Sequence, residues 1–246
     1  MRRAALRRVG HKGADRIAPG NTPASFDAAL AAGVDMIEFD VLAEERAAPG
    51  RGRLVLAHDY ERGLDGAATL EEGLAHLASA PFDSVELDVD LKAPGYEERV
   101  VEALRRHGLV ERSLVSSQWM RSLVRVRALE PRLRLGWSVP RVRRDYTQHW
   151  IWSLPLYAAL RYVHATLPAT AARHLAERRC DAVMAHWKLV TPKLVRAVRA
   201  AGGELYVWTV DDAARILELE ALEVTGVITN DPRVFAQLPS AQVAAE

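Results

Sequence analysis

The sequence has a single cysteine and no long apolar run, and each scarcity excludes a class of protein. With Cys180 alone, the chain forms no internal disulfide, which suits a reducing compartment. The apolar residues 182–184 follow it closely, so we expect a buried, unreactive thiol. No stretch approaches the ~18 uninterrupted apolar residues of a membrane span, and the basic N-terminal residues lack the apolar segment of a secretory signal. We therefore expect a cytoplasmic protein without a transmembrane segment.

Lysine is also scarce, because it supplies only four of the 33 basic residues and arginine supplies the rest. Basic and acidic residues nearly balance at a net charge of +1, so the total charge gives no sign of a nucleic-acid partner. The hydrophobic share of 49% and the charged share of 26% are those of a soluble globular protein. Two of the four lysines, Lys12 and Lys92, lie within two residues of the histidine and acidic residues considered below. This placement suggests a specific task for both.

Short apolar runs alternate with helical patterns from one end of the chain to the other. Such alternation is typical of βαβ units and a parallel sheet. Threonine–proline pairs at 22–23 and 191–192 predict the starts of two helices, and residues 69–72 form a capping box before a third. The candidate strands are residues 6–10, 34–41, 54–57, 84–91, 113–116, 133–139, 182–186, 204–210 and 226–229.

Eight main strands, with 54–57 as a small extra one, predict an α/β protein with a (β/α)8 TIM barrel as a single domain over residues 1–246. A doubly wound open sheet is the alternative, but no glycine-rich dinucleotide fingerprint follows the first strand. The connection 140–168 is longer than a barrel needs, and in it arginines precede tryptophan and tyrosine. We expect a barrel helix with its loops there; the alternative is a lip that contacts lipid-like substrates or a membrane surface. The tail, 239–246, is expected to fray.

Acidic side chains interrupt two predicted strands that are otherwise apolar. Glu38 and Asp40 are two residues apart and therefore share one face of a strand, as do Asp90 and Lys92. Buried carboxylates need a partner or a metal, and functional groups gather at the carboxyl ends of barrel strands. Because oxygen-only ligands favour Mg²⁺ or Ca²⁺ over zinc, we predict that Glu38, Asp40 and a third carboxylate bind such an ion. The candidates for the third position are Glu86, Asp88 and Asp90, of which Asp90 lies nearest the strand end and is preferred.

Two histidines also stand at predicted strand ends: His11 after the first strand, and His58 after the small strand 54–57. Imidazoles titrate near neutral pH, so the pair can act as base and acid in one displacement, in either assignment. The other histidines fall in helical or loop stretches and are expected to be surface or packing residues. The exception is His186, which with Trp187 and Lys188 is a candidate for the mouth of the pocket.

The order of these motifs resembles the glycerophosphodiester phosphodiesterase family, within the superfamily of phospholipase-C-like phosphodiesterases. The family pattern is His-Arg-Gly, Glu-Asn-Thr, Glu-x-Asp-Val and His-Asp, followed by Glu-x-Lys. The similarity covers residues 9–232 of this chain. It is carried by His11-Lys12-Gly13, Pro19-Gly20-Asn21-Thr22, Ile37-Glu38-Phe39-Asp40-Val41, His58-Asp59, Asp90-Leu91-Lys92, Ser116-Ser117, Val207-Trp208-Thr209-Val210 and the segment from Gly226 to Pro232.

This resemblance implies a TIM barrel that hydrolyses glycerophosphodiesters to glycerol phosphate and an alcohol, as part of lipid metabolism. It also implies a role for each matched position. Glu38, Asp40 and Asp90 would bind Mg²⁺ or Ca²⁺, His11 and His58 would be the catalytic acid and base, Lys92 and Lys12 would contact phosphate, and Trp208 would wall the pocket beside the glycerol.

Three positions depart from the family pattern. Lys12 replaces the arginine and Gly20 replaces the glutamate, so we expect that both halves of one ionic contact have been lost, which leaves Lys12 for phosphate. Asp90 replaces a glutamate, as in the spider-venom phospholipase D relatives of this barrel. One alternative is therefore a phospholipase-D-like enzyme, in peripheral contact with lipid, that converts lysolipids or sphingolipids to a cyclic phosphate. The other is a weakly catalytic barrel that binds small phosphorylated ligands; the oligomeric state is left open.

Overall fold

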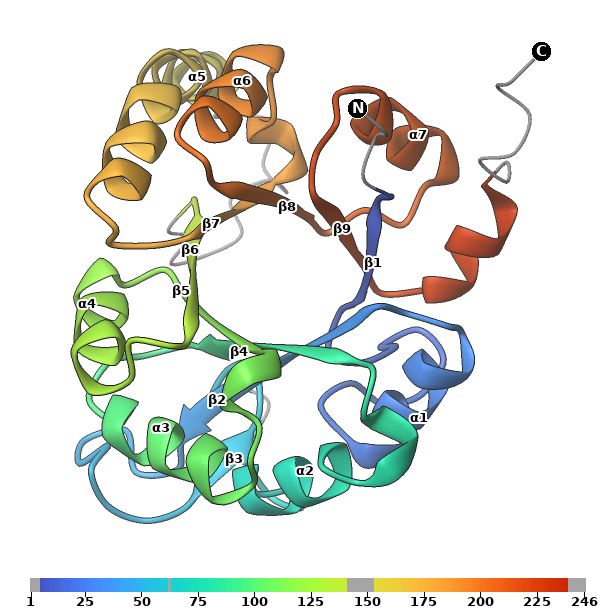
Figure 1. Cartoon of the computed structure of the whole chain (residues 1–246), viewed down its shortest axis with the longest axis vertical. Coiled ribbons are helices and arrows are strands. Elements are labelled where there is room, and N and C mark those ends of the chain that lie inside the picture. The colour runs from blue at the N-terminus through green and yellow to red at the C-terminus, as the bar shows by residue number, and fades with distance from the viewer. Residues whose placement is uncertain (1–4, 62, 141–152, 239–246) are drawn as a thin grey trace.

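The structure, a computed structural model, describes residues 5–61, 63–140 and 153–238, with side chains from residue 160 onward in the last range. Figure 1 shows its strands as a closed ring with helices on the outside. Each predicted strand is present, most with ends shifted by one or two residues. The strands are β1 (Arg7–Gly10), β2 (Met36–Ala43), β3 (Leu54–Leu56), β4 (Glu86–Leu91), β5 (Ser113–Ser117), β6 (Arg134–Val139), β7 (Ala182–His186), β8 (Glu204–Trp208) and β9 (Gly226–Thr229).

Pairing between strands closes the sheet into a barrel. The strand order is β1-β9-β8-β7-β6-β5-β4-β2, and a parallel pairing of β1 with β2 completes the ring. The short β3 pairs with β2 antiparallel and stays outside the ring, as Val41 opposite Leu56 illustrates. The predicted (β/α)8 barrel is therefore confirmed, and the open sheet is excluded.

Helices connect the strands and begin where the sequence predicts. The Thr22 hydroxyl accepts a hydrogen bond from the Ser25 amide at 3.2 Å, and Thr191 caps its helix in the same way. Thr69 and Glu72 form the reciprocal bonds of the predicted capping box. The helices are α1 (Pro23–Ala31), α2 (Leu70–Leu77), α3 (Glu97–Arg106), α4 (Met120–Leu129), α5 (Ser153–Ala176), α6 (Pro192–Ala200) and α7 (Ala213–Ala221), with 3-10 turns at Ala80–Phe82, Val110–Arg112, Trp187–Leu189 and Pro232–Gln237.

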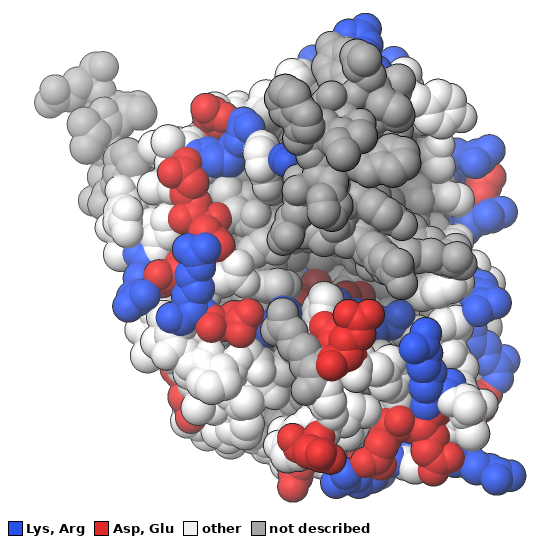
Figure 2. Space-filling view, turned by 180° about the vertical axis from the view of Figure 1, so that it is seen from behind, with Lys and Arg blue, Asp and Glu red and all other residues white. Residues whose placement is uncertain are grey.

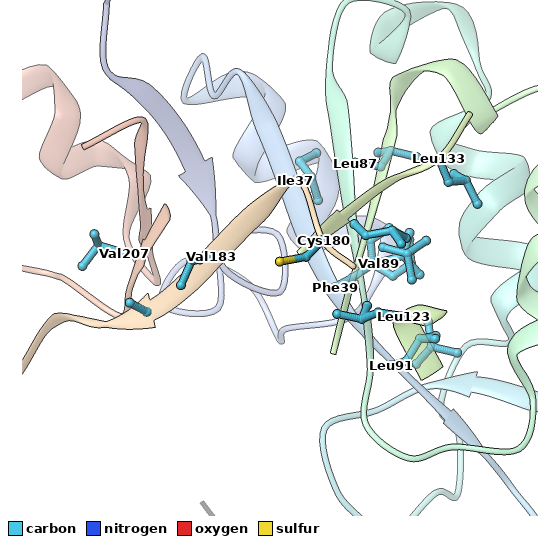
Figure 3. Packing of buried hydrophobic residues seen from close by; sticks show 14 of the residues in the cluster. Ile37, Phe39, Leu87, Val89, Leu91, Leu123, Leu133, Cys180, Val183 and Val207 are labelled. Atoms are coloured by element: carbon cyan, nitrogen blue, oxygen red, sulfur yellow. The ribbon is translucent and has the colours of Figure 1, made fainter. Parts of the chain in front are cut away.

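Alternation along each strand divides the core into two parts. Ile37 and Phe39 of β2 belong to the large cluster of apolar residues between strands and helices, part of which Figure 3 shows. Met36, on the opposite face of the same strand, belongs to a smaller cluster with residues of β1, β5, β7, β8 and β9. Glu38 and Asp40 share the Met36 face, so their carboxylates lie inside the barrel, toward its carboxyl end.

The long connection is helical where the structure describes it. Residues 153–168 form the first two-thirds of α5, which continues through Pro168 to Ala176, beyond the end of the connection 140–168. Proline removes one main-chain donor, but a buried stripe of Leu167, Ala171 and Leu175 at helical spacing holds the helix to the barrel on both sides of that point. The arginines and aromatic residues of 141–152 and the tail 239–246 lie outside the described residues. Among the described helices, none combines the length and apolar character needed to cross a bilayer.

Candidate active site

A cavity of about 210 Å³ opens among the carboxyl ends of the strands. It brings together side chains from β2 and from each strand between β4 and β9, with His11 just after β1 and His58 just after β3, and these segments lie far apart in the sequence. Six of the eight predicted site residues line it: His11, Glu38, His58, Asp90, Lys92 and Trp208. The other two do not line it: the side chain of Asp40 is fully buried beside the cavity, and Lys12 is not among the lining residues.

Three carboxylates converge beside the cavity. One oxygen each from Glu38, Asp40 and Asp90 lies within 4.8 Å of the other two, and all three residues are buried. Asp90 Oδ1 is buried without a hydrogen-bond partner in the described residues. An oxygen-only donor set with an unused buried oxygen fits a hard divalent cation such as Mg²⁺ or Ca²⁺. The geometry therefore suits the ligand set predicted from the sequence, with Asp90 rather than Glu86 or Asp88 as its third member.

Lys92 places its ammonium group among these carboxylates. Its Nζ lies 2.5 Å from Asp40 Oδ1 and 2.6 Å from Asp90 Oδ2. Burial alone would lower the pKa of Lys92, but the neighbouring carboxylates, Asp40 first, raise it well above its usual value. Although burial opposes ionisation of Asp40, Lys92 is the main cause that holds the pKa of Asp40 below its usual range. Burial and the charge of Asp40 together raise the pKa of Glu38.

Asn21 holds Asp40 in place and was not singled out from the sequence. Its Nδ2 donates to Asp40 Oδ2 at 2.9 Å, and its Oδ1 accepts from the Asp40 main-chain amide at 3.0 Å. The backbone of Asn21 has φ 62°, a left-handed conformation that asparagine tolerates better than most residues. The available signal was its position in the motif immediately before the helix cap Thr22.

Lys12 contributes to the site through its main chain. Its amide donates to Glu38 Oε2 at 2.8 Å, in a turn where Lys12 has φ 51°. Its ammonium group lies 3.7 Å from Asp15 Oδ2. Asp15 Oδ1 also accepts from the Gly20 amide at 3.0 Å, and a Cβ at position 20 would come within 2.4 Å of that oxygen. The expected loss of the ionic contact is thus only half right, because Asp15 occupies the space at position 20 and supplies a carboxylate to Lys12.

His11 is held between a carboxylate and an amide. Its Nδ1 lies 2.6 Å from Asn230 Oδ1, and its Nε2 lies 3.8 Å from Glu38 Oε2. Burial lowers the pKa of His11 to about 4, so the imidazole is neutral at pH 7. A neutral, hydrogen-bonded imidazole at the edge of a cavity can accept a proton from a bound hydroxyl or water.

His58 and Trp208 form other parts of the cavity wall. His58 Nδ1 lies 3.0 Å from Asp59 Oδ2, and about half of its side chain is exposed. Trp208 Nε1 donates to the Met184 carbonyl at 2.8 Å, which fixes the indole. The edge-to-face partner of that indole is His186, with ring centroids 5.2 Å apart. The segment 186–188 does not line the cavity, so it supports the wall instead of forming the predicted mouth.

Two polar lining residues, Gln118 and Ser138, were missed from the sequence, and a third, Ser116, was matched to a family motif without a role. Asp88, which had been considered only as a metal ligand, lies in the cavity below Asp90, and burial raises its pKa to about 8. Glu86 lies away from the site, where it pairs with Arg7 and Arg134.

The remaining predictions about single residues concern groups outside the cavity. His76 pairs with Asp27, His107 pairs with Glu71, and neither lines the site. Cys180 is buried, and burial raises the pKa of its thiol to about 12, as expected of an unreactive packing residue. Figure 2 shows acidic and basic side chains interspersed around a hollow on one face, without a broad area of one sign among the described residues there.

Comparison with known proteins identifies one family. The chain matches the model of the glycerophosphoryl diester phosphodiesterase family over residues 11–70 and 95–234. It is 25% identical over 265 residues to a glycerophosphodiester phosphodiesterase of Caldanaerobacter subterraneus subsp. tengcongensis, with 94% of this chain and 96% of the relative covered.

Solved structures show the same fold. A glycerophosphodiester phosphodiesterase from Agrobacterium tumefaciens has a TM-score of 0.69 at 21% identity, covering 95% of this chain and 98% of that one. An Oleispira antarctica phosphodiesterase in complex with the product sn-glycerol-3-phosphate has a TM-score of 0.66 at 22% identity, covering 94% of this chain and 96% of that one. At these identities the likeness supports the barrel architecture.

Proposed function

Because the chain belongs to the glycerophosphoryl diester phosphodiesterase family, we propose that it hydrolyses glycerophosphodiesters to glycerol phosphate and an alcohol with the help of a divalent cation. The observation that carries this proposal is the convergence of three buried carboxylates and two imidazoles on one cavity. The product complex of the Oleispira relative supports a small phosphorylated product of this class.

Glu38, Asp40 and Asp90 would hold the cation. Their oxygen donors and their burial suit Mg²⁺ or Ca²⁺, as argued above. When bound, such an ion supplies positive charge to the phosphate oxygens and helps to orient the attacking hydroxyl or water. Asn21 keeps Asp40 oriented toward the cluster, and the Lys12 amide does the same for Glu38.

The two histidines would move protons in the reaction. A phosphodiester gains negative charge as the attacking oxygen bonds to phosphorus, and the leaving alkoxide then needs a proton. His11 presents Nε2 on the Glu38 side of the cavity, and His58 stands on the exposed side, next to Asp59. One imidazole accepts the proton of the nucleophile and the other protonates the leaving oxygen, each contributing roughly 10²–10⁴-fold to the rate. Lys92 supplies a nearby cation to the phosphate.

A phospholipase-D-like reaction is the second candidate, and the pair Asp90 and Lys92 favours it, because that lineage also carries Asp-x-Lys. In that reaction a hydroxyl of the lysolipid or sphingolipid itself attacks phosphorus, and the product is a cyclic phosphate. A barrel that only binds phosphorylated ligands is less well supported. That alternative was based on the loss of an ionic contact between positions 12 and 20, and in the structure Lys12 instead forms an ion pair with Asp15.

Product analysis of metal-stripped enzyme tests these alternatives. Glycerophosphocholine, glycerophosphoethanolamine, glycerophosphoglycerol and lysophosphatidylcholine would each be incubated with Mg²⁺, Ca²⁺ or Mn²⁺, and products identified by phosphorus NMR. We expect glycerol phosphate from the first three substrates and no turnover in EDTA. A cyclic phosphate from lysophosphatidylcholine alone would favour the second candidate. Full turnover in His11→Ala and His58→Ala proteins would contradict both.

A further inference from the structure

Basic residues are concentrated on one flank of the barrel. From the start of α5 to the end of α6, residues 153–200 hold eight basic and two acidic residues, whereas the rest of the chain holds 25 basic and 30 acidic residues. Neither of these two helices contains an acidic residue. The helices lie side by side on the outside of the ring (Figure 1). A protein with a net charge of only +1 therefore has one strongly positive flank.

Most of the positive charge on this flank is not neutralised by neighbouring carboxylates. The two acidic residues are already paired, Glu177 with Arg179 and Asp181 with Arg127 of α4. On α4, which also lacks acidic residues, both Arg125 and Arg127 pair with carboxylates of neighbouring elements. On the flank, by contrast, five of the eight basic residues are exposed and form no ion pair with a described residue: Arg173, Arg178, Lys188, Lys193 and Arg196.

Each helix packs one face on the barrel and turns the other to solvent. On α6, Lys193 and Arg196 are exposed one turn apart, while residues 194, 195 and 198 are buried. On α5, residues 162, 166, 169 and 173 are exposed at helical spacing, opposite the buried stripe that holds this helix to the barrel. The side chain of Tyr162 is 70% exposed. The outward faces of both helices, with Lys188 between them, are called the basic flank below.

A hydrogen bond places the basic flank beside the mouth of the cavity. His164 Nε2 of α5 donates to the Lys188 carbonyl at 2.8 Å, in the turn that follows β7 at the rim where the cavity opens. A barrel helix runs back from the carboxyl ends of the strands, so residues before His164 lie beyond that rim. Since α5 begins at Ser153, it extends about 16 Å past this point at 1.5 Å per residue. A surface bound to the flank would therefore lie next to the cavity.

We propose that the basic flank docks the protein on an anionic lipid surface. Each basic side chain without a carboxylate partner gains from the negative potential of such a surface. Tyr162, exposed beside these charges, suits the headgroup layer, where an aromatic ring buries its apolar part and keeps its hydroxyl in water. Nucleic acid would attract the same charges, but the headgroup layer also accounts for the exposed tyrosine. The docking itself does not depend on the proposed function.

Co-sedimentation with sucrose-loaded vesicles tests the proposal. The wild type should bind vesicles of phosphatidylcholine that contain phosphatidylglycerol, should bind vesicles of phosphatidylcholine alone much more weakly, and should be released as added salt screens the charges. Lys193→Glu combined with Arg196→Glu should lower the partition coefficient at least about 20-fold, because each basic side chain near such a surface contributes about fivefold. Glutamate is a good helix former, so α6 should persist and Tm should match that of the wild type. Tyr162→Ser should also weaken binding.

Arg46→Glu combined with Arg51→Glu is the matched control. Both arginines are exposed between β2 and β3, and β2 stands opposite β7 in the ring, so the net charge changes equally but far from the flank. This protein should bind within about twofold of the wild type, because surface potentials fade within a Debye length. If the Lys193 and Arg196 variant melted early, Arg173→Glu combined with Lys188→Glu would test the same flank.

Three results would overturn the proposal. The first is equal binding of the wild type to both kinds of vesicle. The second is an equal loss of binding in the control pair, which would show that net charge decides and not the flank. The third is tighter binding to duplex DNA than to the anionic vesicles, lost in the Lys193 and Arg196 variant, which would assign the flank to nucleic acid. If the wild type turned over none of the four substrates, the proposed function would fail, and the vesicle result would still decide the role of the flank.

Discussion

Removal of the Lys92 ammonium should destabilise the metal-free protein strongly. Nζ is within 2.6 Å of two buried carboxylates, and in Lys92→Met these lose their counter-charge while Glu38 remains beside them. Breaking a buried ion pair by removing one partner costs about 3–5 kcal/mol. For a chain of this size, 1 kcal/mol corresponds to about 2–4 °C in Tm, so Tm should fall by about 6–20 °C.

The assay is thermal unfolding followed by circular dichroism at pH 7.5 in EDTA, with Lys193→Met as the control. Lys193 is an exposed lysine of α6, and its replacement should change stability by no more than about 0.5 kcal/mol. Saturating Mg²⁺ or Ca²⁺ should restore much of the lost Tm, because a divalent cation supplies the missing positive charge. A metal-free Lys92→Met protein that melts with the Lys193→Met control would refute the reasoning.

The pH dependence of that difference follows from the shifted groups. Lys92 has a raised pKa in the folded state, so its stabilisation is present below its unfolded pKa and is lost as the pH rises through the folded value. Asp40 has a lowered pKa, so its stabilisation is present above its unfolded pKa of about 4 and is lost as the pH falls further. In Lys92→Met the buried carboxylates lose the charge that keeps them ionised, so they take up protons as the pH falls and the variant is then less destabilised. The difference between wild type and Lys92→Met should therefore be largest on the alkaline side of neutrality, shrink as the pH falls, and shrink again above about pH 10.

Three further outcomes are expected. Asp90→Ala should weaken Mg²⁺ or Ca²⁺ binding in calorimetric titration, and unchanged affinity would remove Asp90 from the ligand set. Tyr96→Phe should cost about 1–3 kcal/mol in urea unfolding, because the buried hydroxyl donates to the Val41 carbonyl at 2.7 Å; a loss near zero would contradict this. Hydrogen bonds from Arg132 and Arg105 lower the pKa of Glu130 to about 2. The stabilisation of the folded protein by ionised Glu130 is therefore present above about pH 4.5 and is lost toward pH 2. Glu130→Gln should therefore flatten the fall in urea stability over that range, and an unchanged slope would show that the pair does not form.

Local features of the sequence predicted most of the fold. Apolar runs and helix caps depend on residues a few positions apart, and for that reason the caps at Thr22, Thr69 and Thr191 and each strand could be identified in advance. Packing decides what local rules leave open. Pro168 closes the connection 140–168 in the sequence, yet α5 continues past it because a buried stripe of residues holds the helix on both sides.

The sequence by itself determined which chemical groups are present and on which face of a strand they lie, because strand alternation is a local property. It therefore supplied the carboxylates, the two histidines and Lys92. The tertiary structure alone decided which of these groups meet. The contact of His11 with Asn230 spans 219 positions, and it exists because β1 pairs with β9 when the ring closes. The contact of Asp15 with Gly20 and Lys12 depends on a turn in which Lys12 has a left-handed backbone, and that conformation was not predicted from the sequence. Ring closure and turn geometry are properties of the whole chain, and they turn a set of polar strand ends into one site.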